Sequence, residues 1–294
     1  MAAATWKYLT PEDIRRLRNY EFGVKAMVEG YLSGRHRSVQ RGSSTEFHEF
    51  RQYVPGDDPA RVDWRVFARS DRLFLRTFEQ ETNLECHIVL DCSASMGFAG
   101  AESRWSKLEY CSFFAACLAW LVASGGDRVS LTLFDKGIRR FIPAGSTRRH
   151  LHDVLTTLEH TQPGEGTSLT DTLRRAAALV RRRGTLVIVS DFFHDPAELF
   201  LALNPWIHRG FRIHLLHVLD PSEESLEDRG LARFEDMESG ESLTVHPRAV
   251  REAWKSALLE HTRSLRSLAA SRRVEYLRVN TAQSYFQLFD TLCR

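Results

Sequence analysis

Small oxygen-bearing side chains follow two of the most apolar segments of the chain. Asp91, Ser93 and Ser95 alternate directly after one short apolar run, and Asp191 follows another. A chain leaving a strand can aim every second side chain at one point. Carboxylate and hydroxyl oxygens gathered in this way suit Mg²⁺, which keeps several waters and takes only one or two carboxylates from a protein.

A third candidate ligand, Thr167, lies in the glycine-rich loop 164–168. Two aspartates and three hydroxyls from three loops therefore predict a metal site made of Asp91, Ser93, Ser95, Thr167 and Asp191. Each motif alone has a structural alternative, because serine and aspartate are also preferred helix N-caps. The three motifs together favour the metal, although three nearby acids could replace one of these ligands: Glu165, Asp171 and Asp195.

Short apolar runs alternate with helical patterns through most of the chain. Strands are expected at residues 86–91, 128–134, 138–142, 185–190, 211–219 and 274–279. Helices are expected at residues 107–124, 148–159, 169–183, 196–208, 248–271 and 283–292. This alternation predicts a doubly wound, Rossmann-type α/β domain, whose mostly parallel sheet has helices on both faces. Ligands bind such sheets beyond the carboxyl ends of the strands, where the candidate ligands lie.

Composition excludes several classes of protein. The 294 residues are 43% hydrophobic and 27% charged, an ordinary globular balance, and a net charge of +2 gives no basic excess for nucleic acid. The longest apolar stretch, residues 113–123, is shorter than the roughly 20 residues of a membrane helix. No secretory signal pattern is visible, and the five cysteines show no Cys-x-x-Cys spacing. We therefore expect a cytoplasmic protein without a membrane span.

Two segments break the strand–helix rhythm. Residues 1–84 hold dense Gly, Arg and Asp signals, and we expect them to form an amino-terminal extension packed against an α/β domain at residues 85–294. Residues 221–241 are rich in acids, with Arg229 and Arg233 as their basic residues. This acidic insertion is expected to form a short hairpin around residues 239–240. A solvated loop is favoured there over a surface that docks a basic partner.

The three-part ligand set resembles a known site. Asp91-x-Ser93-x-Ser95, Thr167 in a Gly-Thr loop and Asp191 after a buried strand are similar to the metal-ion-dependent adhesion site of von Willebrand factor A domains. The resemblance implies that the first aspartate and both serines ligate the metal, that the threonine adds a hydroxyl, and that the later aspartate often acts through water. It also implies an open coordination position that accepts a carboxylate from a partner.

A longer pattern in the amino-terminal part points to a narrower family. It consists of Gly34-Arg-His36-Arg37-Ser38, Gly42, Glu46-Phe47, Arg51-Gln-Tyr53-Val-Pro55-Gly56-Asp57-Asp58, Arg61-Val-Asp63-Trp64, Ala68-Arg69 and Phe78-Glu79. This pattern resembles the bacterial domain of unknown function family fifty-eight. Members of that family carry a von Willebrand A-like domain and are typically encoded beside MoxR-type AAA ATPases.

The family resemblance implies a non-enzymatic interaction module that depends on Mg²⁺, Mn²⁺ or Ca²⁺. Its expected role is that of an adaptor or co-chaperone in the assembly or maturation of client proteins. The implied partner is a MoxR-type ATPase, or a client that offers an acidic residue to the metal.

Four residues of the amino-terminal signature are candidates for partner binding: Arg61, Asp63, Trp64 and Arg69. Arginine and tryptophan dominate the energetic hot spots of protein interfaces. The structural alternative is an Arg/Asp network that pins this segment onto the α/β domain. We favour the structural alternative slightly, because a segment without a core of its own must be held by something.

A serine hydrolase is the rival from the enzyme class. Residues 93–97, Ser-Ala-Ser-Met-Gly, nearly match the G-x-S-x-G nucleophile elbow, so that Ser95 would act with Asp191 and with His217 or His246. The first glycine of the motif is missing, which removes the strained turn, and order alone relates either histidine to the site. We therefore expect no catalytic residues.

Overall fold

The computed structural model describes residues 7–21, 24, 27, 46–53, 62, 64–70, 72–79, 84–101, 103–226, 230–238 and 240–292. The chain forms two compact units. Residues 1–32 and 84–294 make the larger unit, and residues 33–83 make the smaller one. The first 32 residues, however, group with the α/β unit and not with the rest of the expected extension.

The larger unit is built on a six-stranded sheet with the order β10-β7-β6-β3-β4-β5. Its strands are β3 (Glu85–Asp91), β4 (Arg128–Phe134), β5 (Ile138–Gly145), β6 (Thr185–Ser190), β7 (Arg212–Leu219) and β10 (Glu275–Asn280). Neighbouring strands run parallel except at the β4–β5 edge, which is antiparallel. Every residue of β3 and β6 is buried. The predicted doubly wound, mostly parallel sheet is therefore confirmed.

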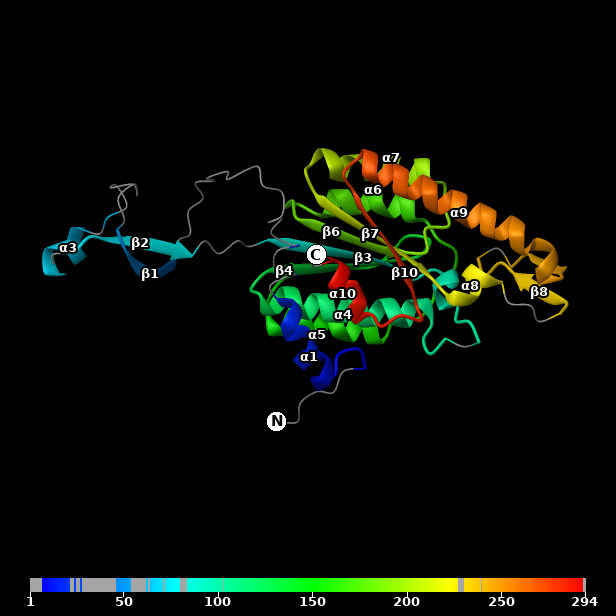
Figure 1. Ribbon diagram of the computed structural model, residues 1–294, viewed down its shortest axis with the longest axis horizontal. Coiled ribbons are helices and arrows are strands. Elements are labelled where there is room, and N and C mark those ends of the chain that lie inside the picture. The colour runs from blue at the N-terminus through cyan, green and yellow to red at the C-terminus, as the bar shows by residue number, and fades with distance from the viewer. Residues whose placement is uncertain are drawn as a thin grey trace. The chain divides into compact units, whose positions relative to one another are not determined.

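Helices cover both faces of this sheet (Figure 1). One face carries α1 (Pro11–Leu17), α4 (Lys107–Ser124), α5 (Arg148–Glu159) and α10 (Phe286–Leu292). The other face carries α6 (Leu169–Leu179), α7 (Pro196–His208) and α9 (Pro247–Ser271). Each layer closes its own apolar core against the sheet.

Helix α6 ends earlier than the pattern predicts. The expected helix ran to residue 183, whereas α6 ends at Leu179 and Val180 is already extended. The Arg209 guanidinium donates to the carbonyl oxygens of Ala177, at 2.7 Å, and Val180, at 2.6 Å. Carbonyls at a helix end need such partners, so Arg209 stabilises the early stop.

Helix α4 is buried on nearly all sides. Among the described residues it is long and apolar enough to cross a membrane by length and composition alone, but 78% of that stretch is buried inside the protein. A helix that is apolar all round is typical of a large core as well as of a membrane span. The packing of α4 under the sheet accounts for its composition.

Contacts with α4 and α10 explain why the first residues join the larger unit. Helix α1 begins with a capping box between Thr10 and Asp13, and Leu17 at its end is fully buried. The Tyr285 hydroxyl donates to Asp13 Oδ1 at 2.7 Å. A helix this short has little stability by itself, so its tertiary contacts hold it in place.

The smaller unit contains an antiparallel pair, β1 (Glu46–Gln52) with β2 (Phe74–Glu79), and the helix α3 (Trp64–Ser70). The side chain of Trp64 is 61% exposed and packs edge-on against Phe67, and Arg69 is also exposed. The other two candidate partner-binding residues, Arg61 and Asp63, lie outside the described residues. The assignment of these four residues therefore stays a prediction.

The acidic insertion contains a helix and the first strand and turn of a hairpin. Helix α8 (Pro221–Ser225) comes first, followed by the antiparallel strands β8 (Ala232–Glu235) and β9 (Ser242–Val245). The short hairpin expected around residues 239–240 is therefore present. Gly240 adopts a φ of 74°, a left-handed conformation that glycine reaches without steric cost.

A buried histidine in β3 makes the stability of the larger unit sensitive to acid. The ring of His87 is almost fully buried, with Nδ1 2.7 Å from Ser130 Oγ and Nε2 3.5 Å from Glu85 Oε2. Burial lowers the pKa of His87 to about 4, and the charges of Arg209 and Arg128 act in the same direction. His87 is therefore neutral in the folded protein at neutral pH.

We expect the buried His87 to lower the free energy of unfolding as the pH falls from about 6.5 toward 4. In that range the unfolded chain binds a proton on the imidazole and the folded chain does not, so the free energy of unfolding decreases. Between pH 7 and pH 5 the wild type should lose about 2 kcal/mol more than His87→Gln. Urea unfolding at both pH values measures this difference. Equal losses in the two proteins would contradict it.

Candidate metal centre

Two of the predicted ligands lie at the ends of neighbouring parallel strands. Asp91 ends β3, and Asp191 directly follows β6. The Asp91 carboxylate is fully buried and accepts hydrogen bonds from the Ser93 amide, at 2.9 Å, and the Ser190 hydroxyl, at 2.7 Å. These bonds fix the carboxylate at the carboxyl edge of the sheet, as the sequence predicts.

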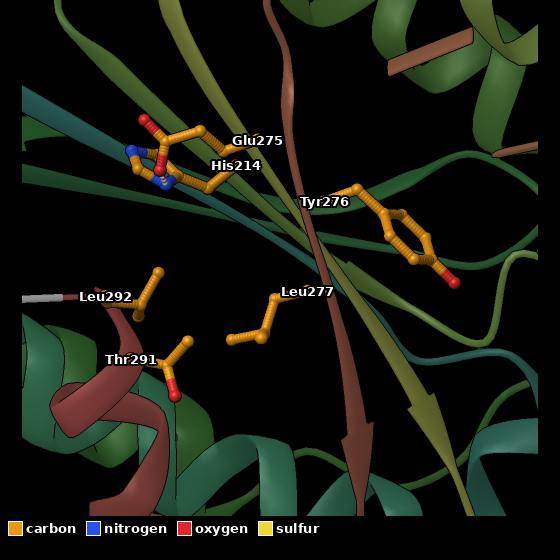
Figure 2. Close-up of a pocket in the computed structure, with 6 residues that line it drawn as sticks. All are labelled: His214, Glu275, Tyr276, Leu277, Thr291 and Leu292. Atoms are coloured by element: carbon orange, nitrogen blue, oxygen red, sulfur yellow. Dashed lines mark ion pairs between the residues drawn. The ribbon is translucent and has the colours of Figure 1, made fainter. Parts of the chain in front are cut away.

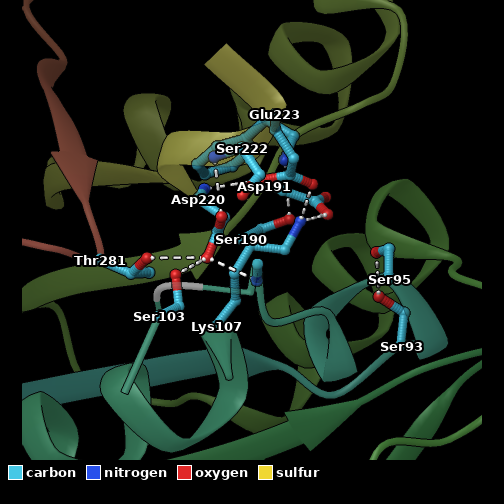
Figure 3. A network of polar contacts seen from close by, with 12 residues as sticks. Ser93, Ser95, Ser103, Lys107, Ser190, Asp191, Asp220, Ser222, Glu223 and Thr281 are labelled. Carbon is cyan, nitrogen blue, oxygen red and sulfur yellow. Dashed lines mark hydrogen bonds and ion pairs between the residues drawn. The ribbon is translucent and has the colours of Figure 1, made fainter. Parts of the chain in front are cut away.

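The serine hydroxyls are not used as helix caps. Ser93 precedes the short helix η3 (Ala94–Gly97), but its side chain makes no cap hydrogen bond. Its Oγ lies 3.1 Å from Ser95 Oγ (Figure 3). Helix α4 is capped by Ser106, and α7 is capped by Asp195. The capping alternative for Ser93, Ser95 and Asp191 is therefore wrong.

Backbone contacts join the glycine-rich loop to the loop after β3. The Ala94 amide donates to the Glu165 carbonyl at 3.2 Å, and the Gly164 amide donates to the Cys92 carbonyl at 2.6 Å. A Cβ at Gly164 would lie 2.2 Å from Asp135 Oδ2, so a side chain at this position would have to displace the Asp135 carboxylate. The two loops are held side by side.

Thr167 connects this loop to the segment that follows β6. Its Oγ1 lies 3.4 Å from His194 Nε2. The structure therefore brings all three predicted loops to one edge of the sheet, with Asp91, Ser93, Ser95 and Asp191 around the ends of β3 and β6.

Asp91 and Asp191 differ in the groups that surround their carboxylates, and their pKa values shift in opposite directions. Burial, followed by the charge of Asp191, raises the pKa of Asp91 to about 7, against the hydrogen bonds from Ser190 and Ser93. Burial alone would raise the pKa of Asp191 as well. The ammonium of Lys107 and the hydroxyl of Ser95 outweigh burial there and lower the pKa of Asp191 below its usual value. Among the described residues, no basic side chain pairs with the Asp91 carboxylate.

The family match covers the candidate site. Residues 49–264 match the family described as "Protein of unknown function DUF58". This range contains all five predicted ligands. The chain belongs to this family.

The chain is similar in sequence to uncharacterized proteins of mycobacteria. The uncharacterized protein Mb1516 of Mycobacterium bovis is 32% identical over 260 residues, which cover 85% of this chain and 79% of that protein. The uncharacterized protein Rv1480 of Mycobacterium tuberculosis is similar to the same extent. Neither name states an activity, so the function of this DUF58 chain must be argued from its site.

Among solved structures, the chain is similar to BatB from Bacteroides thetaiotaomicron. The identity is 17%, the match covers 71% of this chain and 98% of that one, and the TM-score is 0.45. The SpRpn10 VWA domain is 11% identical, with coverage of 71% and 95% and a TM-score of 0.43. Neither likeness bears on activity or ligands.

Sequence reasoning about this DUF58 member missed a buried lysine. Lys107, the first residue of α4, is fully buried and donates to Asp191 Oδ2 at 2.9 Å and to Glu223 Oε1 at 2.7 Å (Figure 3). Only one signal in the sequence marks it, a lysine directly before a long apolar helix. Lys107 gives Asp191 a counter-charge, whereas no described basic side chain pairs with Asp91.

A second carboxylate network lies at the end of β7. Asp220 is fully buried and accepts hydrogen bonds from the amides of Ser222, at 2.9 Å, and Gly100, at 3.1 Å (Figure 3). The Asp220 amide donates to Glu223 Oε2 at 2.8 Å. Glu223 therefore contacts both this network and Lys107.

The three acids considered as replacement ligands have other partners. Glu165 pairs with Lys136 and Asp171 pairs with Arg174, and all four side chains are more than half exposed. Asp195 caps α7 through the Ala197 amide at 2.6 Å. Each of these carboxylates thus has a local structural role.

The composition of the remaining donors fits a hard divalent cation. In the described part of the chain, no group of three or more His, Cys, Asp or Glu side chains is arranged to hold a metal. A site at Asp91 would instead combine two carboxylates with hydroxyls, the kind of oxygen set that Mg²⁺ accepts together with waters. The charge of Asp91, buried beside that of Asp191, is what such a cation would offset.

The serine hydrolase alternative is not supported. His217 is buried with Nδ1 2.6 Å from the Tyr276 hydroxyl, and His246 is exposed before α9. The Ser95 hydroxyl lies 3.1 Å from Ser93 Oγ, and within the described residues it has no hydrogen bond to a histidine. A serine nucleophile needs a base within hydrogen-bond reach, and neither proposed histidine provides one.

A surface cavity lies away from this centre. It has a volume of about 240 Å³ and is lined by His214, Glu275, Tyr276, Leu277, Thr291 and Leu292 (Figure 2). His214 Nδ1 lies 3.0 Å from Glu275 Oε2. Because Glu275 begins β10, the cavity is at the amino end of that strand, whereas the candidate ligands follow the carboxyl ends.

Proposed function

We propose that this DUF58 chain is a non-enzymatic protein-interaction module that holds an acidic residue of its partner through a divalent cation. The cation would be bound by Asp91, Ser93, Ser95, Thr167 and Asp191. The observation that carries the proposal is the convergence of three loops at a buried carboxylate, Asp91, that pairs with no basic side chain among the described residues.

Each part of the chain would have a distinct task in this centre. The Ser93 amide and the Ser190 hydroxyl orient the Asp91 carboxylate, and the paired hydroxyls of Ser93 and Ser95 supply neutral oxygens. A bound divalent cation would supply a positive charge that two carboxylates, one already paired with Lys107, neutralise only in part. This remaining charge would attract a partner's carboxylate.

We further propose a MoxR-type AAA ATPase, or a client protein handled with it, as the source of that carboxylate. The support is the family membership together with the genomic association implied by the resemblance. The role would be that of an adaptor in the assembly or maturation of other proteins. Binding of the purified ATPase in Mg²⁺, and its loss in EDTA, tests this assignment.

Metal dependence is tested by following thermal unfolding while Mg²⁺ or Mn²⁺ is added. At a cation concentration about 100-fold above Kd, the melting temperature of the wild type should rise by roughly 5–10 °C. Asp91→Ala should show no rise. Because this substitution also removes a buried charge, the readout is the metal-dependent shift within each protein and not the starting stability.

Asp171→Ala is the matched control, since it removes an acid from the exposed first turn of α6. This variant should respond to the cation as the wild type does. Absence of any cation-dependent shift in the wild type would refute the metal site.

A further inference from the structure

The turn that follows β6 presents an aromatic ring beside the candidate metal centre. Asp191 and Phe192 are buried, whereas Phe193 is 40% exposed. The centroid of the Phe193 ring lies 5.5 Å from Lys107 Nζ, and the same ammonium lies 2.9 Å from Asp191 Oδ2. One buried ammonium group therefore contacts both a predicted ligand and an exposed ring.

Neighbouring rings hold Phe193 in place. Two half-buried residues of α9 flank it, Trp254 with a ring centroid at 6.3 Å and His261 with one at 6.4 Å. The ring of His217, in β7, meets Phe193 edge-on at 6.4 Å. Trp254 is itself fixed, since its indole donates to the Glu223 carbonyl at 2.5 Å. We call the group Phe193, Trp254 and His261 the aromatic patch.

The backbone of this turn is strained, and surrounding hydrogen bonds hold the strain. Phe192 has a φ of 50°, a left-handed conformation that a bulky side chain rarely adopts. Its carbonyl oxygen accepts hydrogen bonds from His261 Nε2, at 2.9 Å, and from the His194 amide, at 2.6 Å. The Phe192 amide donates to Ser190 Oγ at 3.0 Å. Strain of this kind is concentrated at functional sites and ligand clamps, so the turn is a candidate recognition element.

The aromatic patch differs from other exposed apolar residues of the larger unit. Among the described residues, neither Phe193 nor Trp254 belongs to either apolar core. Leu201 and Leu259 are also exposed, at 57% and 47%, but they lie on the helices α7 and α9, and scattered apolar residues are ordinary on a protein surface. Aromatic rings that are fixed by their neighbours and partly open to solvent are typical of the contacts that dominate protein interfaces.

The charge around the aromatic patch selects the kind of side chain that it would bind. Lys107 already places a positive charge beside the Phe193 ring, so a lysine or arginine of the partner would meet a like charge there. An acidic side chain on the ring would lose water without gaining a cation, since the Lys107 ammonium is paired with Asp191 and Glu223. A neutral aliphatic or aromatic side chain meets neither cost.

We propose that the aromatic patch binds an apolar side chain that stands within a few residues of the partner's acidic residue. The inference rests on the proposed function and adds to it the kind of partner that the site accepts. An extended chain advances by about 3.5 Å per residue, so a segment that places its acid at the cation reaches the patch within a few positions. The acid would anchor the segment, and the apolar side chain on Phe193 would distinguish it from other acidic segments.

The test selects random peptides displayed on phage against the wild type in Mg²⁺ buffer. The selected peptides should carry Leu, Met, Phe or Trp within a few positions of an Asp or Glu. The strongest of them should bind Phe193→Ala at least about tenfold more weakly in calorimetry. Phe193→Leu keeps an apolar side chain and should lose less. Leu201→Ala removes an exposed leucine of α7 and should bind like the wild type. Thermal unfolding without peptide checks that each variant is folded.

The outcomes separate the two proposals. If the selected peptides bind in Mg²⁺ and not in EDTA, but bind Phe193→Ala as tightly as the wild type, the aromatic patch is not a contact and the cation site stands. If EDTA leaves their binding unchanged, the proposed function fails, and the partner class inferred from it fails with it. A selection that enriches no peptide over an unrelated control protein would overturn both.

Discussion

Replacing Lys107 with methionine is expected to lower the free energy of unfolding by about 3–5 kcal/mol in metal-free buffer. The Lys107 ammonium is fully buried between the carboxylates of Asp191 and Glu223. Methionine keeps the length of the side chain but leaves two acids without their counter-charge. Breaking a buried ion pair in this way is costly because the remaining charge is removed from water and has no partner. Urea unfolding at pH 7 in EDTA measures the loss.

Lys136→Met provides the comparison. Lys136 pairs with Glu165, but both side chains are mostly exposed, and water screens such a pair so that it contributes little to stability. A Lys107→Met protein that loses no more stability than Lys136→Met would contradict the buried ion pair. A second readout is available, because a divalent cation beside Asp191 should restore more stability to Lys107→Met than to the wild type.

Replacing Asp220 with alanine is the second large effect, with an expected loss of about 3 kcal/mol or more. The Asp220 carboxylate caps α8 through the Ser222 amide and accepts from the Gly100 amide, the Ser103 hydroxyl and the Thr281 hydroxyl. Alanine would remove the cap and leave these buried and half-buried donors without an acceptor, and each buried donor that loses its partner costs about 1–3 kcal/mol. Thermal and urea unfolding both report the loss.

The variant Asp195→Ala measures the stability lost with a helix cap alone, without a buried hydrogen-bond network. Asp195 also caps a helix, but it does so at an exposed site, so its replacement should cost about 1 kcal/mol. A comparable loss in Asp220→Ala would mean that the additional hydrogen bonds of Asp220 contribute nothing. Asp220→Asn should retain part of the stability, because one amide oxygen can still accept.

The sheet and most helices could be predicted from sequence because their signals are local. Apolar runs such as Thr185–Ser190 are short and bounded by polar residues, and α4 has Ser106 before it and Gly125 after it as cap and stop. The early end of α6 could not be predicted in this way. It depends on Arg209, a residue from a later helix end that binds the carbonyls.

The residues of the candidate site, too, could be predicted from sequence only where their signals are local. The loops that carry Asp91 and Asp191 could be placed at one edge because the parallel strands β3 and β6 end together. Lys107 and Glu238 reach the same place from a helix start and a distant hairpin, and local pattern does not tell where a long charged side chain points. In a sequence, a run of acidic residues indicates a solvated surface. Its tertiary contacts can be seen only in the structure.

The position of Glu223 makes the two carboxylate networks one electrostatic unit. One of its oxygens accepts from Lys107 and the other accepts from the Asp220 amide, so the ends of β6 and β7 share a single acid. The Trp254 indole in turn donates to the Glu223 carbonyl, which extends the unit to the long helix α9. Substitutions at Lys107 and Asp220 are therefore coupled and their energies will not sum. A change of charge at the candidate site therefore alters the surroundings of α9, a helix that supplies none of the proposed ligands.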